Sequence, residues 1–230
     1  MTEKNINIYQ IYYLAEQLNR LDTAFVPYDN SKPTYSAEES NKLREWPIIR
    51  THGFERAKQD DSDIWGFVSY KFQEKTNTTG QEFVDFIKNN PDNDVWFMEP
   101  EYVNNPFFNP WTQGDLYHPG VSQIPNALFK KDGQPLDVTK IPMSFCWYNF
   151  FAGTSKFWNQ YFHTMDAIIE ASKKSQNLDQ ILFHTGAGHG NDPTVPYFIF
   201  VVERMFPTLL ALSNLKSTGL KYKHVDFIFR

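Results

Sequence analysis

The chain has 230 residues, of which 41% are hydrophobic, and this length and composition fit one large domain. Its formal net charge is −5 and no Lys/Arg-rich run stands out, which argues against a protein that binds a nucleic-acid backbone. The single cysteine, Cys146, excludes an intrachain disulfide framework and fits a reducing compartment. The N-terminus lacks the apolar core of a signal peptide, and no apolar run reaches the roughly 18 residues of a membrane span, so we expect a cytoplasmic protein.

The first part of the chain predicts two strands separated by a polar segment. Asn5–Tyr13 is rich in β-branched and aromatic residues with partial alternation, which is typical of a strand. The segment 27–45 is polar and contains two prolines, so it predicts a loop, followed by a short helix over 37–46. Ile64–Phe72 has the composition of a second strand.

A helix and a third strand follow. Thr79 and Glu82 have the spacing of a capping box, and apolar residues recur after them at helical intervals. A turn at 91–94 leads into the short apolar strand Val95–Met98. The order strand, helix, strand from Ile64 onward favours a parallel α/β sheet.

The chain changes character over Glu99–Gln123, where prolines, asparagines and aromatic residues replace aliphatic ones. A loop of this length in a compact domain is usually functional or disordered, and its aromatic residues argue against disorder. Beyond it, Met143–Phe151 predicts a strand, and Ser155 begins an amphipathic helix whose apolar stripe reaches Ile169.

The last part of the chain predicts two strands around one helix. Ile181–His184 predicts a short strand, followed by the Gly-rich turn TGAGHGND. Pro196 begins a helix that reaches about Leu212 and is kinked or interrupted near Pro207. The chain ends on the strand-like stretch Lys223–Phe229, which leaves open that these residues are part of a longer protein.

Aromatic residues make up 17% of the chain, more than a core requires. Packing in the core is the simpler interpretation for any one ring. Taken together, the excess favours a carbohydrate or another ring-shaped ligand, since sugar rings stack on such surfaces through their C–H faces.

Two carboxylates flank a proline at the end of the third strand. Because ligands bind at the carboxyl ends of sheet strands, Glu99 and Glu101 are candidates for holding a divalent cation and a diphosphate. The alternative is two exposed acids on a turn that Pro100 fixes.

The stretch QGDLYHPG supplies a second candidate. A tight turn here would bring Asp115 beside His118, so that Asp115 orients the imidazole or acts as a general base. Alternatively, Asp115 caps the turn and His118 packs on aromatic residues.

Three further groups of residues are candidates for binding an anion or a proton. His184 and His189 flank a Gly-rich, anion-friendly turn that matches neither a dinucleotide fingerprint nor a P-loop. Glu203 and Arg204 lie in an otherwise apolar helix, where charges are costly unless they are paired or face a cleft. Lys71 and Lys75 lie at the carboxyl end of the second strand, where a cation could meet a phosphate. The alternatives are a mobile surface loop, a structural ion pair and solvated lysines, respectively.

Five stretches stand out in chain order: NIYQIYY with LDTAFVPYDNS, WGFVSYKFQEKT, NPWTQGDLYHPG, YNFFAGTSKFW and VPYFIFVVERMFPTLLAL. Together they resemble a family of small glycosyltransferase-like proteins encoded among bacterial polysaccharide-assembly genes. The resemblance spans nearly the whole chain. It implies a GT-A-like α/β fold, with a central, mostly parallel sheet flanked by helices. A nucleotide-sugar half would cover about 1–105, and an acceptor half about 106–230, within a single domain.

The GT-A resemblance also implies an "N-x-F-x-A" strand leading into a helix, which is Asn149–Trp158 here. GT-A enzymes often hold Mg²⁺ or Mn²⁺ with a DxD pair after a strand, and this chain has only Glu99-Pro100-Glu101 there. The family's typical acids are instead Asp115 and Glu203, so the resemblance leaves the metal requirement open.

The activity implied is transfer of a sugar from a nucleotide-diphosphate sugar to a glycan acceptor. The resemblance makes Asp115 the base or a sugar ligand, with His118 beside it, and Glu203 the second candidate base. The remaining implied roles fall to three groups. Diphosphate contacts are Lys71, Lys75 and Arg204; nucleotide contacts are Gln10, Tyr12, Asp29 and Asn30; and sugar contacts are Trp111, Tyr117, Trp147 and Asn149.

Two other functions fit the same residues. One is a non-catalytic carbohydrate-binding or assembly domain that uses the aromatic loop. The other is a glycoside hydrolase, which needs two carboxylates about 5–10 Å apart across the sugar.

Overall fold

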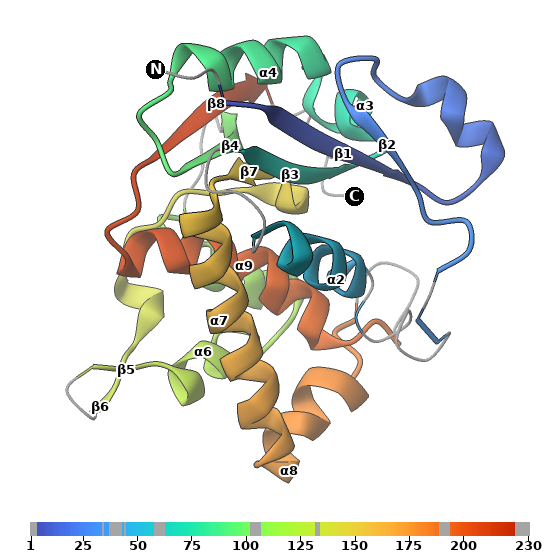
Figure 1. Ribbon diagram of the computed structural model, residues 1–230. Coiled ribbons are helices and arrows are strands. Elements are labelled where there is room, and N and C mark those ends of the chain that lie inside the picture. The colour runs from blue at the N-terminus through green and yellow to red at the C-terminus, as the bar shows by residue number, and fades with distance from the viewer. Residues whose placement is uncertain are drawn as a thin grey trace.

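The computed structural model describes residues 4–33, 35–36, 43, 45–57, 63–101, 107–131, 134–188 and 194–223. These residues form an α/β fold with one main sheet of mixed strand direction and helices on both of its faces (Figure 1). None of the helices described is long and apolar enough to cross a membrane.

The main sheet has six strands in the order β2-β1-β3-β7-β4-β8. Their bounds are β1 Ile6–Tyr12, β2 Val26–Asp29, β3 Ile64–Ser69, β4 Val95–Glu101, β7 Phe151–Gly153 and β8 Ser217–Lys223. Strand β1 pairs in parallel with β2 and β3, and β4 pairs in parallel with β8. Strand β7 is antiparallel to both of its neighbours, β3 and β4. Strands from both predicted halves of the chain therefore build a single sheet.

The remaining elements cover this sheet or connect its strands. The longer helices are α2 Trp46–Ala57, α4 Gly80–Asn89, α7 Ser155–Lys173 and α9 Tyr197–Leu212. The shorter ones are α3 Phe72–Thr76, α5 Pro110–Tyr117, α6 Gln123–Leu128 and α8 Gln176–Asp179. Single turns are η1 Ala15–Arg20, η2 Val138–Lys140, η3 Trp147–Asn149 and the π-helical η4 Gln180–His184. A small hairpin joins β5 Lys130–Lys131 to β6 Gln134–Pro135.

Each face of the sheet carries its own apolar core because successive side chains of a strand point to opposite faces. In β4, Val95 and Phe97 join the larger core, which α2, α7 and α9 cover. Trp96 and Met98 join the smaller core on the other face, against α3 and α4. Figure 1 shows the two helical layers above and below the strands.

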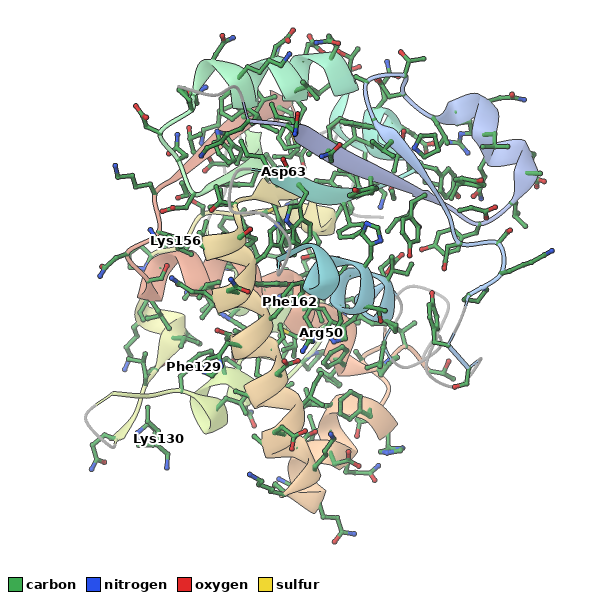
Figure 2. All side chains as sticks on the ribbon, viewed as in Figure 1. Arg50, Asp63, Phe129, Lys130, Lys156 and Phe162 are labelled. Atoms are coloured by element: carbon green, nitrogen blue, oxygen red, sulfur yellow. The ribbon has the colours of Figure 1, made fainter. Side chains whose placement is uncertain are left out.

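Helix α7 anchors the larger core. Its stripe of buried residues matches the predicted amphipathic pattern. Trp158 stacks on Trp65 of β3 with ring centroids 4.1 Å apart, and its indole N–H donates to the Trp65 carbonyl at 2.9 Å. Arg50 of α2 packs over the ring of Phe162 and binds Asp166 with two hydrogen bonds, which joins α2 to α7 (Figure 2).

Strand β7 fits between β3 and β4 only because β3 has a glycine at the contact. A Cβ added to Gly66 would lie 2.3 Å from the carbonyl oxygen of Phe151, which is far too close. Gly66 therefore permits the antiparallel insertion that brings the segment before β7 to the carboxyl edge of the parallel strands.

Several sequence expectations are confirmed. The expected strand Asn5–Tyr13 contains β1, and the expected strand Val95–Met98 is the first part of β4. The helices expected after Thr79 and from Ser155 are α4 and α7. Helix α9 reaches Leu212 as expected, but it continues through Pro207, and Pro196 is its N-cap.

Other expectations are wrong in their type of structure. The segment 99–123 is no continuous loop, because β4 extends to Glu101 and Pro110–Tyr117 forms α5. Asn109 caps α5 by accepting hydrogen bonds from the backbone N–H groups of Trp111 and Thr112. Residues 180–184 form a π-helical turn and not a strand. A short apolar run such as 181–184 fits either a strand or a helical turn, and tertiary packing decides which one forms.

Smaller differences concern element bounds. Strand β3 ends at Ser69, because Phe72 turns into α3 and packs on Phe83 of α4. The polar segment after Phe25 contains the edge strand β2, and α2 was not foreseen. Of the strand expected at 143–151, only Phe151 is in a strand. Lys223 is the last residue of β8, and the rest of the expected strand 223–229 lies outside the described residues, as do 37–42 of the expected short helix.

The capping box of α4 yields a stability prediction. The Thr79 hydroxyl accepts from the Glu82 N–H at 3.2 Å, and the Glu82 carboxylate accepts from the Thr79 N–H at 2.7 Å. We expect Thr79→Ala to lower the free energy of unfolding by about 1 kcal/mol, since it leaves a helix N–H without its acceptor. Urea denaturation measures this change. Gln81→Ala, on the same turn, is the control and should change stability by less than about 0.5 kcal/mol.

Candidate functional site at the carboxyl edge of the sheet

Five parallel strands end at one edge of the sheet, where ligands bind in open α/β proteins. The last residues of these strands are Tyr12, Asp29, Ser69, Glu101 and Lys223. Because β7 runs the other way, the segment that precedes it, Trp147–Asn149, reaches the same edge.

Tyr12, Asp29 and Asn30 come together at the ends of β1 and β2. The Tyr12 hydroxyl donates to the Asp29 carboxylate, and burial together with this bond raises the pKa of Tyr12. The Ser31 N–H donates to Asp29 at 2.8 Å, which lowers the pKa of that carboxyl. The Asn30 N–H donates to the Tyr12 carbonyl at 2.8 Å, so β1 and β2 hold these three residues as one group.

Gln10 does not belong to this group, and its expected role in nucleotide binding stays a prediction. Its side chain is buried, with the amide N–H donating to the Ser69 carbonyl at 3.3 Å. Its side-chain oxygen accepts from the Asp22 N–H at 2.7 Å. Gln10 therefore links β1 to β3 and to the loop before β2.

Lys75 lies in the last turn of α3, directly beyond β3. Burial lowers its pKa, while the negative charges of Glu203 and Glu45 oppose that shift. Its ammonium group lies 3.9 Å from the centre of the Tyr148 ring, in a cation–π contact. Lys71, the N-cap of α3, also acts electrostatically on Lys75. Two cations thus lie together at the end of β3.

The backbone before β7 adopts an uncommon conformation. Tyr148 and Asn149 have φ values of 66° and 57°, in the left-handed region that glycine favours. The side-chain oxygen of Asn149 is buried and has no hydrogen-bond partner among the described residues. Strained backbone and unpaired polar atoms concentrate at ligand sites, so the segment is a candidate contact for a ligand.

Glu203 of α9 faces the same region. Its side chain is 24% exposed. Burial raises the pKa of Tyr148, and the charge of Glu203 raises it further. Since Glu203 also acts on Lys75, the structure brings these residues together from α3, η3 and α9. We call Lys71, Lys75, Tyr148, Asn149 and Glu203 the edge cluster.

Arg204 is engaged by the protein itself, and its expected contact with a diphosphate stays a prediction. Its side chain is 3% exposed, and burial lowers its pKa. The guanidinium donates to the carbonyls of Pro110 and Phe200 at 2.9 and 3.0 Å, and to the Gln113 side chain at 3.3 Å. These contacts direct its donors to protein acceptors and hold α5 against α9.

For Asp115 and His118 the geometry favours the structural interpretation. The Asp115 carboxylate accepts from the N–H of Ser122 at 3.0 Å and from the Ser122 hydroxyl. His118 is 4% exposed, with Nδ1 3.0 Å from the Ala187 carbonyl oxygen and its ring stacked on Phe200 at 3.5 Å. Both residues lie at the carboxyl end of α5, where they fasten the turn that follows it.

The three aromatic residues expected to stack on sugars have different positions. Trp111 is fully buried and donates its indole N–H to Thr208 at 2.8 Å, so it cannot stack on a sugar in this structure. Tyr117 is partly exposed on α5, and Trp147 is partly exposed beside Phe145, with ring centroids 5.3 Å apart.

Glu99 and Glu101 lie on β4 and not on a turn, which corrects the expected effect of Pro100. Glu99 pairs with Lys221 of β8 at 2.8 Å. Within the described ranges, no three His, Cys, Asp or Glu side chains are placed to hold a metal ion together. Glu99 is thus held by a lysine, and the divalent-cation role expected for the acid pair stays a prediction.

The candidate Gly-rich turn is described in part. His184 is exposed and forms an ion-pair contact with Asp179 at 3.2 Å when protonated. The turn bends back where the Ala187 N–H donates to the Val195 carbonyl at 2.8 Å. His189 lies outside the described residues.

A cavity of about 490 Å³ lies beside the end of β4. Its walls are formed by Glu99, Pro100, Phe107, Phe108, Pro142, Met143, Ser144 and Phe145. Sequence reasoning missed most of these residues and also Tyr148. The left-handed backbone of Tyr148 leaves no sequence signal, because it occurs without glycine.

No protein-family model matches this sequence, and a comparison with curated proteins finds no match either. Among solved structures, the chain is similar to the apo structure of the bifunctional glycosyltransferase WbbM, with a TM-score of 0.48 and 11% sequence identity. The alignment covers 95% of this chain and 45% of that chain. The chain thus spans less than half the length of the WbbM chain.

Proposed function

We propose that this protein is a glycosyltransferase that moves a sugar from a nucleotide-diphosphate sugar to a hydroxyl group of a glycan acceptor. The observation that carries the proposal is the edge cluster. A partly buried lysine pair and a carboxylate that acts on it electrostatically lie near the edge where parallel strands end, which is where α/β proteins bind ligands.

The reaction needs a base and a stabiliser of the departing charge. The acceptor oxygen bonds to the anomeric carbon while the bond from that carbon to the diphosphate oxygen breaks, and the diphosphate leaves with the electron pair. Glu203 takes the proton of the acceptor hydroxyl, because it is the partly exposed carboxylate of the edge cluster. Lys71 and Lys75 stabilise the charge that develops on the diphosphate.

The nucleoside end of the donor is assigned to the ends of β1 and β2. Asp29 accepts hydrogen bonds from hydroxyl or N–H groups, and Tyr12, held beside it, supplies an aromatic ring. Glu99 pairs with Lys221, so in this proposal the lysines of the edge cluster stabilise the diphosphate charge.

The sequence resemblance supports the same proposal at β7. The stretch YNFFAGTSKFW forms η3, β7 and the start of α7, so a segment similar to the "N-x-F-x-A" pattern, with Gly153 at the alanine position, leads into a helix as in GT-A enzymes. Asn149, the first residue of that pattern, carries the unpaired buried oxygen.

A binding experiment tests the proposal directly. Thermal shift and calorimetry with uridine, guanosine and thymidine diphosphates and their sugar conjugates, with and without Mn²⁺, should show stabilisation by at least one nucleotide. At a ligand concentration of 100 times the dissociation constant, the expected stabilisation is about 2.7 kcal/mol. Stabilisation by free oligosaccharides alone would contradict the transferase and favour a binding module or hydrolase.

A further inference from the structure

The cavity beside β4 takes no part in the donor chemistry described above. Its volume of about 490 Å³ lies within the range of about 300–1,000 Å³ that is typical of small-molecule sites. Among the described residues, its wall combines aromatic rings with two polar side chains, Glu99 and Ser144.

We propose that this cavity is the acceptor subsite and that it binds a neutral pyranose ring of the glycan. That the bound sugar is the acceptor rests on the proposed function, whereas the binding of a sugar ring is inferred from the cavity alone.

The aromatic side chains suit the faces of a sugar ring. Phe108 lines the cavity and its side chain is 54% exposed, so a large apolar surface is open to a ligand. Phe145 is held on edge against Trp147, with centroids 5.3 Å apart. A rigid, partly wet aromatic surface binds the C–H face of a pyranose with little loss of side-chain entropy.

Glu99 decides between a neutral sugar and an anion. A carboxylate accepts hydrogen bonds from sugar hydroxyls, and it repels phosphates and acidic sugars. Its position is fixed, since Lys221 binds it at 2.8 Å and a Cβ on Gly219 would lie 2.5 Å from its oxygen. Among the described residues that line the cavity none is a cation, so the donor diphosphate is directed to the lysines at the end of β3 and away from this cavity.

Glu203 lies on a helix that packs close to the cavity. Helix α9 contacts η3, which begins two residues after the cavity residue Phe145. The charge of Glu203 also acts on Lys75. On these grounds we assign removal of the acceptor proton to Glu203.

Saturation-transfer difference NMR tests the inference without a donor. The probes are the methyl glycosides of glucose, galactose, mannose and N-acetylglucosamine, with methyl glucuronide as the anionic comparison. We expect at least one neutral glycoside to bind, and uridine diphosphate not to displace it. Phe108→Ala should weaken its affinity about threefold to tenfold. The matched control is Leu116→Ala, which truncates an exposed apolar residue of α5 that does not line the cavity.

Glu99→Gln provides a second variant that keeps the side-chain volume. It should weaken binding of the neutral glycoside and remove the discrimination against methyl glucuronide. Binding of no neutral glycoside, displacement by uridine diphosphate, or unchanged affinity in Phe108→Ala would each overturn the inference. Failure of the nucleotide experiment with these results intact would instead overturn the transferase and leave a sugar-binding site.

Discussion

Glu203→Gln is expected to lower the rate of sugar transfer at least about 100-fold, because the amide cannot take the acceptor proton. The substitution keeps the size of the side chain and removes a single charge. Donor affinity should therefore change little, and the loss should fall on kcat. Product formation from a radiolabelled nucleotide sugar, followed under single-turnover conditions, measures the chemical step separately from binding.

Two variants control this prediction. Glu170→Gln makes the same change on the exposed face of α7, where Glu170 pairs with Lys173, and should leave transfer unchanged. Asp115→Asn tests the base that the resemblance favoured. We expect it to keep transfer and to lower stability by about 1 kcal/mol, since it weakens the hydrogen bonds from Ser122. Full transfer in Glu203→Gln together with its loss in Asp115→Asn would reverse the assignment.

The fold was predictable where one local signal dominated. The capping box at Thr79 located α4, and the apolar stripe after Ser155 located α7. Two further features depend on contacts between distant segments. Strand β7 is short and lies between β3 and β4 because Gly66 leaves room for it. Strand β4 can include Pro100 because its pairing with β7 ends at Phe97, and at Pro100 it pairs with β8. No local sequence pattern reveals this.

For the candidate site, sequence reasoning found residue types but not their environments. It selected Glu203 and Lys75, which the fold brings to one place from segments far apart in the chain. It also selected Arg204 and Trp111, whose polar groups the fold uses to join α5 to α9. A sequence shows that a residue is charged or aromatic but not how deeply it is buried. Arg204 and Trp111 are buried, whereas Glu203 and Lys75 are partly exposed. Tyr148 and the cavity wall were missed because their positions result from tertiary structure alone.

Lys75→Met is expected to weaken binding of a nucleoside diphosphate about 10-fold to 100-fold, since a charge-assisted contact to phosphate is lost. Stability should stay the same or rise, because burial already penalises the ammonium, as its lowered pKa indicates. Calorimetry and thermal unfolding measure the two quantities in parallel. Lys173→Met, on the exposed face of α7, is the control and should alter neither.

The pH dependence of the same interaction identifies the lysine. Only the protonated ammonium attracts the diphosphate, so affinity is full below the pKa of Lys75 and falls as pH rises through it. Because burial lowers this pKa, the fall begins at a lower pH than for an ordinary lysine. In Lys75→Arg the guanidinium stays protonated, and this part of the pH dependence should disappear. A pH profile that is identical in both proteins would show that Lys75 does not contact the diphosphate, even if Lys75→Met binds weakly.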